Sequence, residues 1–272
     1  TEGLMGVVIN AAAHGVERKL ERPIMSTCHG MWSLGAMMGA ATGSVIAGLN
    51  IALRPHLLMI SLTVLTPLLL SPKIIQMFDT LPSPEQKKGF QMPNMVLLAI
   101  SFAAFSIFLN EGAIADWSAV YLRETLKSEP YLVGMAYAGY ALFMAIGRFT
   151  GDMLIPKFGK KNLVIGGSLL SALSMSALLI LHDPWVAIVG FSLVGLGFSC
   201  IVPILYSSAA NEPGYTAESA IAVVSTISFT GFFIGPPIIG FISEQYGLSL
   251  ALILVVGLSI MICAIGTMIQ FK

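Results

Sequence analysis

Charge is what this sequence has least of. Lys and Arg contribute 14 residues and Asp and Glu another 14 among 272, so charged side chains make up 10% of the chain, whereas soluble domains carry roughly 25%. That deficit excludes an ordinary soluble enzyme. The formal net charge is zero, which offers no basic patch for a nucleic-acid partner.

Cysteine and histidine are also scarce, with three and four residues. The three cysteines are far apart in apolar stretches, and this odd number of isolated thiols predicts no disulfide framework. The histidines show no metal-ligand spacing, so we expect no metal and no cofactor. A membrane-embedded enzyme would need a nucleophile with a base, or a metal set. Because no convincing spacing of that kind occurs, we expect no enzymatic activity.

Apolar residues dominate what is present, at 56%, which is more than one soluble core could bury. A membrane-spanning helix needs about 20 mainly apolar residues. Charge and proline gaps then divide the chain into a partial span that ends near residue 13 and eight full spans. These lie at about 25–49, 55–75, 94–115, 131–155, 162–181, 185–208, 218–242 and 248–270. The predicted fold class is an all-α, polytopic membrane protein with the lipid bilayer around it.

The longest polar gap, residues 71–93, holds four prolines and three lysines and separates three helices from six. We therefore expect residues 1–70 to belong to one helix bundle, 71–93 to form a linker, and 94–272 to form a second bundle. The loops on the linker side carry eleven Lys and Arg against three on the opposite side. This positive-inside asymmetry predicts that the linker and the C-terminus are cytoplasmic.

A weak internal repeat favours two related halves. Adding 196 to the positions of Gly35 and Gly39 gives Gly231 and Gly235, and the same shift relates Asn10 to Tyr206. Parallel repeats of six helices are one of the transporter plans. Matched glycines also arise simply because membrane helices use Gly for close packing.

Polar side chains inside the predicted spans are the candidate binding residues, because charges in a membrane core are costly. Asn110 lies 16 residues beyond Asn94, roughly 24 Å along a helix, and Glu111 follows it. Glu111 could bind a solute or a proton, or could lie at a solvated helix end. His29 and Trp32 occupy neighbouring helix turns, with Asn10 in the preceding span. The alternative for His29 is a packed, hydrogen-bonded side chain.

A second set of charged residues lies at the predicted cytoplasmic end. Arg148 and Asp152 are four residues apart, so they share one helix face and can pair. Lys157, Lys160 and Lys161 follow directly. We interpret the five as an inner gate whose ion pairs break and re-form. A static ion pair beside ordinary cytoplasmic charges is the alternative.

Five short motifs occur in order along the chain. They are Val16-Glu-Arg, His29-Gly-x-Trp-Ser-Leu-Gly35, Glu111-Gly-x-x-x-Asp-Trp117, Gly147-Arg-Phe-Thr-Gly151 and Gly235-Pro-Pro-x-x-Gly240. Together they make the sequence resemble the major facilitator superfamily, specifically the YbjJ-like bacterial inner-membrane proteins akin to the fucose-permease group. The resemblance covers essentially the whole chain.

The resemblance implies twelve helices in two six-helix bundles around a central site. On that pattern about nine of the twelve helices are present, from within helix four to helix twelve, and the missing N-terminal helices of the same protein would complete the site. The implied function is secondary transport of a small polar solute, a sugar or related metabolite, across the bacterial inner membrane by alternating access. Coupling to protons is left open. The alternative is a transporter-like sensor or partner subunit without net flux.

Overall fold

The fold is helical throughout the part of the chain that a computed structural model describes, residues 2–48, 54–55, 57–65, 69 and 92–271. No strand occurs within those ranges. Two helices precede the predicted linker, α1 (Glu2–Leu20) and α2 (Met25–Gly48). The elements after it are α4 (Met95–Val120), the π-helical turn η1 (Tyr121–Thr125), α5 (Pro130–Val133), α6 (Met135–Phe158), α7 (Lys160–Leu181), α8 (Pro184–Phe198), α9 (Ile201–Ala210), α10 (Ala217–Tyr246), α11 (Leu248–Ala251) and α12 (Ile253–Met268).

Six helical segments of the described chain are long and apolar enough to cross a membrane. They are Met95–Thr125, Pro130–Phe158, Lys160–Leu181, Pro184–Ala210, Ala217–Tyr246 and Leu248–Met268. These segments confirm the last six predicted spans and the all-α, polytopic fold class. The span predicted at 25–49 forms α2, whose apolar residues are interrupted by Ser, Thr, His and Gly, and it is not among the six. Most of the span predicted at 55–75, and nearly all of the predicted linker, lie outside the described residues.

The first helix continues further than its apolar run. We expected the run to end near residue 13, in a charged stretch, but α1 extends to Leu20. Arg18 and Lys19 lie in its last turn, where positive side chains interact favourably with the negative end of the helix dipole. The charged stretch is therefore helical, and it carries Glu17 to the place where α2 begins.

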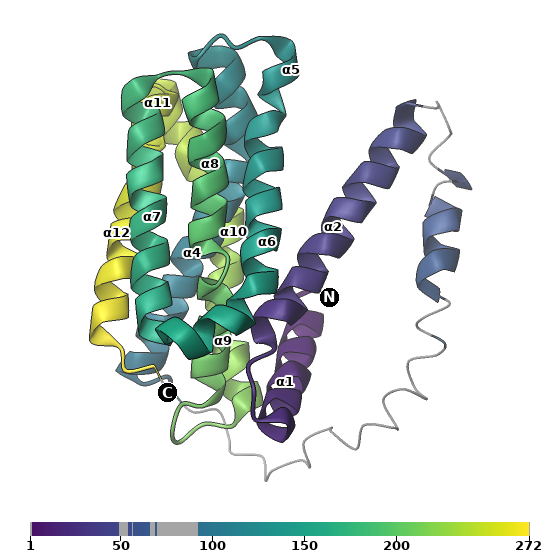
Figure 1. Cartoon of the computed structure of the whole chain (residues 1–272), viewed down its shortest axis with the longest axis vertical. Helices are drawn as coiled ribbons and strands as arrows, with labels where there is room; N and C mark the ends of the chain where they lie inside the picture. The colour runs from purple at the N-terminus through teal and green to yellow at the C-terminus, as the bar shows by residue number, and fades with distance from the viewer. Residues whose placement is uncertain (1, 49–53, 56, 66–68, 70–91, 272) are drawn as a thin grey trace.

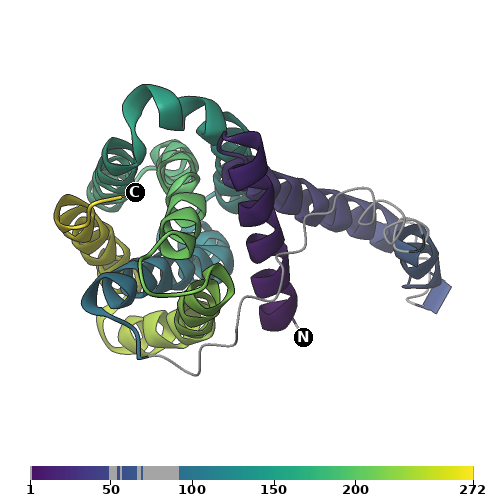
Figure 2. The same cartoon turned by 90° about the horizontal axis from the view of Figure 1, so that it is seen from below.

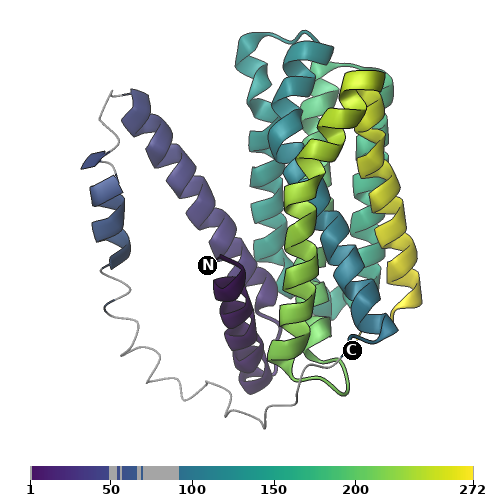
Figure 3. The same cartoon turned by 180° about the vertical axis from the view of Figure 1, so that it is seen from behind.

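The helices after residue 92 form one bundle, and α1 and α2 lie to one side of it (Figure 1). Helix α1 packs against α10, and α2 packs against α6. The view in Figure 2 shows α1 running beside the bundle while α2 extends away from it. From behind, in Figure 3, α2 also diverges from the bundle with increasing distance from its first turns. The contact between α2 and the bundle is thus concentrated at one end.

Glycines allow α4 and α10 to pack backbone to backbone. A Cβ atom added at Gly235 would lie 2.5 Å from the carbonyl oxygen of Leu109, and one added at Gly112 would lie 2.7 Å from that of Phe232. Pro236 has no N–H, so the Phe232 carbonyl lacks its usual helical donor. The bare backbone of Gly112 therefore accommodates an oxygen that a proline has freed.

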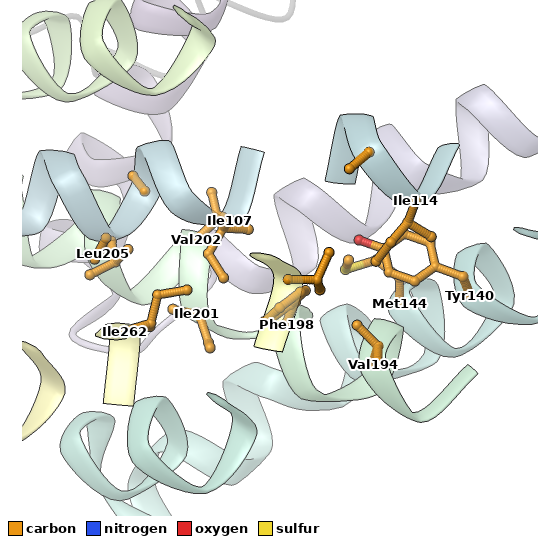
Figure 4. Close-up of a cluster of buried hydrophobic side chains, with 14 of the residues drawn as sticks. Ile107, Ile114, Tyr140, Met144, Val194, Phe198, Ile201, Val202, Leu205 and Ile262 are labelled. Carbon is orange, nitrogen blue, oxygen red and sulfur yellow. The ribbon is translucent and has the colours of Figure 1, made fainter. Parts of the chain in front are cut away.

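Large side chains from several helices fill the interior of the bundle. Figure 4 shows Ile107 and Ile114 of α4 facing Val194, Phe198 and Val202 of the α8–α9 segment. All five side chains are at most 1% exposed. This apolar cluster holds α4 in place, and Asn110 lies on α4 between the two isoleucines.

Candidate functional site

Arg148 is the centre of a polar cluster that joins three helices. It lies on α6 with 7% of its side chain exposed. One terminal nitrogen, Nη1, donates a hydrogen bond to Ser33 Oγ on α2, and the other, Nη2, lies 4.0 Å from Glu111 Oε1 on α4. Arg148 Nε has no hydrogen-bond partner among the described residues. The guanidinium therefore bridges α2 and the bundle with part of its donor capacity unused.

Arg148 and Asp152, which share a face of α6, do not form an ion pair in this structure, and their role as a gate stays a prediction. Instead the two Asp152 carboxylate oxygens accept hydrogen bonds from the backbone N–H groups of Ser26, at 3.1 Å, and Thr27, at 2.7 Å. These N–H groups belong to the first turn of α2, where no helical acceptor is available and the helix dipole attracts negative charge. Asp152 thus caps a helix of another part of the chain, and Ser26 Oγ donates to the Arg148 carbonyl at 2.8 Å.

A second carboxylate completes the start of α2. Glu17 of α1 accepts hydrogen bonds at Oε1 from the backbone N–H groups of Ile24 and Met25, both at 2.9 Å. Burial acts to raise the pKa of Glu17, but His14, whose Nδ1 lies 3.9 Å from Glu17 Oε2, and the hydrogen bonds from these two N–H groups outweigh burial, so the pKa lies below its ordinary value. The resulting stabilisation is complete at neutral pH and is lost as the pH falls through the lowered pKa.

His29 and Asn10, two of the candidate binding residues, lie next to each other. His29 Nε2 and Asn10 Oδ1 are 3.0 Å apart, and the His29 ring lies 5.8 Å from that of Tyr206 on α9. Ser225 of α10 donates a hydrogen bond to Tyr206 Oη at 3.1 Å. Trp32, by contrast, is 59% exposed, and its role stays a prediction. A chain of polar side chains therefore runs from α1 through α2 to α9 and α10.

Asn110 is fully buried, with 0% of the residue exposed. Neither its side-chain oxygen nor its nitrogen has a hydrogen-bond partner within the described residues, and the same holds for the buried hydroxyl of Tyr140 on α6. An unpaired buried amide costs about 1–3 kcal/mol. Such a cost is uncommon in a well-packed interior, and it marks Asn110 as a candidate binding group.

Replacing Asn110 with Leu should raise the free energy of unfolding by about 1 kcal/mol, because an apolar side chain of similar size removes the unpaired amide. Unfolding in mixed detergent micelles measures this change. The exposed Asn162 is the matched control, since Asn162→Leu should change stability by less than about 0.5 kcal/mol. A loss of stability in Asn110→Leu would mean that the amide has an internal partner.

The three lysines of the predicted gate have different surroundings. Lys160 Nζ lies 3.5 Å from Ser207 Oγ and is near enough to Glu17 for an electrostatic interaction. Lys161 Nζ donates to the Thr267 carbonyl at 2.7 Å, so it satisfies an acceptor at the end of α12. Lys157 is exposed. Among these three lysines, Lys160 is the one that interacts with a residue of α1, namely Glu17.

Three residues of the site were missed by the sequence analysis. Ser33 and Ser26 bind Arg148 through side-chain oxygens, and single serines in a membrane helix carry no distinctive pattern. Glu17 stood inside the quoted motif Val16-Glu-Arg. The available signal was its position eight residues before Met25, where a helix begins shortly after Pro23.

The comparisons with known proteins agree on one family. The model of the Major Facilitator Superfamily matches residues 96–271. An uncharacterised MFS-type transporter of Yersinia pestis is 36% identical over 249 residues, 92% of this chain and 64% of its own length. The membrane protein MosC of Rhizobium meliloti is 32% identical over 96% of this chain and 64% of its own length. The chain thus spans a little under two thirds of each of these relatives.

A solved structure shows the same fold. The crystal structure of the Escherichia coli fucose:proton symporter FucP matches 98% of this chain and 82% of its own, with a TM-score of 0.71. The sequence identity is 14%, so this similarity establishes the arrangement of the helices and nothing about the solute.

Proposed function

This chain belongs to the major facilitator superfamily, and from that premise we propose that it forms part of a secondary transporter that moves a small polar solute across the bacterial inner membrane by alternating access. The family and its relatives are transporters rather than enzymes. We further propose that residues 1–70 belong to the N-terminal bundle, 71–93 to the linker and 94–272 to the C-terminal bundle. The YbjJ-like subgroup stays a prediction.

The observation that carries this proposal is the uneven attachment of α2 to the bundle. At its first turn, α2 is bound to α6 through Asp152 and to α1 through Glu17. Farther along, α2 diverges from α6 (Figures 1 and 3). Closure at one end combined with separation at the other is what alternating access requires of two rocking bundles. The positive-inside asymmetry favours the closed end as the cytoplasmic one, with the C-terminus on that side.

The same contacts support a revised inner gate. In this gate, Asp152 holds the cytoplasmic end closed, because its negative charge binds the N-terminus of α2. Lys160 of α7 is assigned to the contact with α1, through its electrostatic interaction with Glu17. Arg148 lies one turn of α6 farther from the cytoplasmic end than Asp152, and there it donates a hydrogen bond to Ser33 of α2. Opening toward the cytoplasm would then require these charge-assisted hydrogen bonds to break.

Glu111 is the proposed coupling residue, because its side chain is 26% exposed and its carboxylate lies 4.0 Å from a buried cation. The charged or titratable groups shown near it are Arg148, Tyr137 and Tyr140, all of α6. Binding of a proton to Glu111 would weaken its attraction to Arg148 and so loosen the link between α4 and α6. His29, Asn10, Asn110 and Trp32 are the proposed solute contacts.

Transport by the full-length protein in membrane vesicles tests the function. Labelled sugars and related metabolites are offered with and without a proton gradient, to the wild type and to Glu111→Gln. We expect the variant to lose gradient-driven uptake and to keep counterflow, since exchange of bound solute needs no net proton movement. Glu124→Gln is the matched control, because Glu124 is 55% exposed and outside the cluster.

The vesicle result separates the two functional readings. Uptake and counterflow of any solute above empty vesicles establish a transporter. Absence of flux for the whole panel, with protein that unfolds cooperatively, would contradict transport and favour a sensor or partner subunit. Equal loss in Glu111→Gln and Glu124→Gln would contradict the coupling role of Glu111.

A further inference from the structure

Arg148 is a buried cation whose charge is only loosely neutralised. Only 7% of its side chain is exposed, so 93% is buried. The one carboxylate paired with it in the described chain, that of Glu111, is 4.0 Å away. Its Nε is buried without a hydrogen-bond partner in those residues. Guanidinium groups bind carboxylates best as bidentate pairs at about 2.7–2.9 Å. The arrangement around Arg148 falls short of that geometry.

Asp152 does not supply the missing negative charge. It is on the same face of α6, yet both of its oxygens are bound to the backbone of α2. Ser33 binds one terminal nitrogen as a neutral acceptor. Within the described ranges, Glu111 is thus the single ion-pair partner of Arg148, and it binds one terminal nitrogen of the guanidinium at the limit of ion-pair distance.

Glu111 is the more exposed member of the ion pair with Arg148. Its side chain is 26% exposed, compared with 7% for Arg148. The Tyr137 ring, 43% exposed, is stacked on that of Tyr140 with centroids 6.1 Å apart. Tyr137 and Tyr140 lie near enough to both Glu111 and Arg148 for an electrostatic interaction, so the aromatic pair, the carboxylate and the guanidinium belong to one neighbourhood.

Building on the transport function proposed above, we propose that Arg148 binds an acidic group of the solute, and that this carboxylate takes the position of Glu111 in the ion pair. The solute class is then a small organic acid or sugar acid rather than a neutral sugar. The exchange conserves charge at Arg148, because one carboxylate replaces another. Ser33 keeps the guanidinium in place, and Tyr137 packs against the body of the solute.

The first test asks whether Arg148 accepts an external carboxylate. In Glu111→Gln the guanidinium has lost its partner, so sodium acetate should act as a substitute and raise the melting temperature by at least about 2 °C. Acetamide with sodium chloride at the same ionic strength is the neutral control. The double variant Arg148→Met with Glu111→Gln should show no acetate-specific rise. An equal rise in the double variant, or no rise in Glu111→Gln, would overturn the inference.

The second test compares matched solutes in vesicles that carry the full-length wild type. D-galacturonate and D-galactose differ in a carboxylate at one carbon, and galacturonate should compete at least tenfold better in counterflow. Competition by galactose alone would overturn the acid preference and leave transport established. No flux of any solute, beside an acetate effect that depends on Arg148, would contradict the transport function and still support the acid-binding site.

Discussion

Replacing Asp152 with Ala should release the first turn of α2 from the bundle. The substitution removes two hydrogen bonds to backbone N–H groups of Ser26 and Thr27 and the negative charge at the helix N-terminus. Loss of a capping side chain costs about 0.5–2 kcal/mol, and the charge raises the value toward the upper limit. A loss of about 2 kcal/mol corresponds to a roughly 30-fold increase in the open population. Hydrogen exchange of the peptide that spans residues 24–30 should accelerate by a similar factor.

Asp183 provides a matched control for this experiment. It caps α8 within the bundle, where its Oδ1 accepts hydrogen bonds from the N–H groups of Trp185 and Val186 at 2.9 and 3.0 Å. Asp183→Ala therefore removes a cap of similar chemistry without touching α2. It should accelerate exchange at the start of α8 and leave residues 24–30 unchanged. Unchanged exchange of residues 24–30 in Asp152→Ala would show that Glu17 alone holds α2, and would contradict the assigned gate.

Most of the fold was accessible from the sequence because membrane spans are long and uniformly apolar. The segments predicted at 94–115 and 218–242 correspond to α4 and α10, although both helices extend beyond the predicted ends. The ends were missed for one reason. Polar residues such as Asp116 and Glu244 continue a helix once its hydrogen bonds are established, whereas a hydropathy pattern ends where polarity begins. The same reasoning applies to α1, which continues through Glu17 to Leu20.

The composition of the site was easier to predict than its pairing. Glu111, Arg148 and Asp152 were all candidates, because a charge within an apolar span is costly and calls for a partner, and their roles stay predictions. Their partners were not identified. Spacing along α6 favours a pair between Arg148 and Asp152, but it says nothing about the free N–H groups of another helix. Asp152 binds two such groups, and that contact depends on how α2 meets α6 in space.

Arg148 and Glu111 should depend unequally on each other for stability. Arg148 is nearly fully buried and remains protonated in proteins, so Glu111→Gln leaves a buried charge unpaired. Glu111 is a quarter exposed, so in Arg148→Met it can be hydrated or can take up a proton. Glu111→Gln should therefore lower the free energy of unfolding by roughly 3 kcal/mol, and Arg148→Met by about 1 kcal/mol.

The double variant then distinguishes an electrostatic cause from lost packing. If the unpaired cation is the source of instability, adding Arg148→Met to Glu111→Gln removes it, and the double variant should be about 2 kcal/mol more stable than Glu111→Gln alone. Equilibrium unfolding of the four proteins in mixed micelles measures the cycle. Additive losses, or a larger loss in Arg148→Met than in Glu111→Gln, would mean that Arg148 supports the fold through Ser33 and its aliphatic chain. The cation would then be a structural bridge, and the loosely paired charge would be no reason to expect an acidic solute.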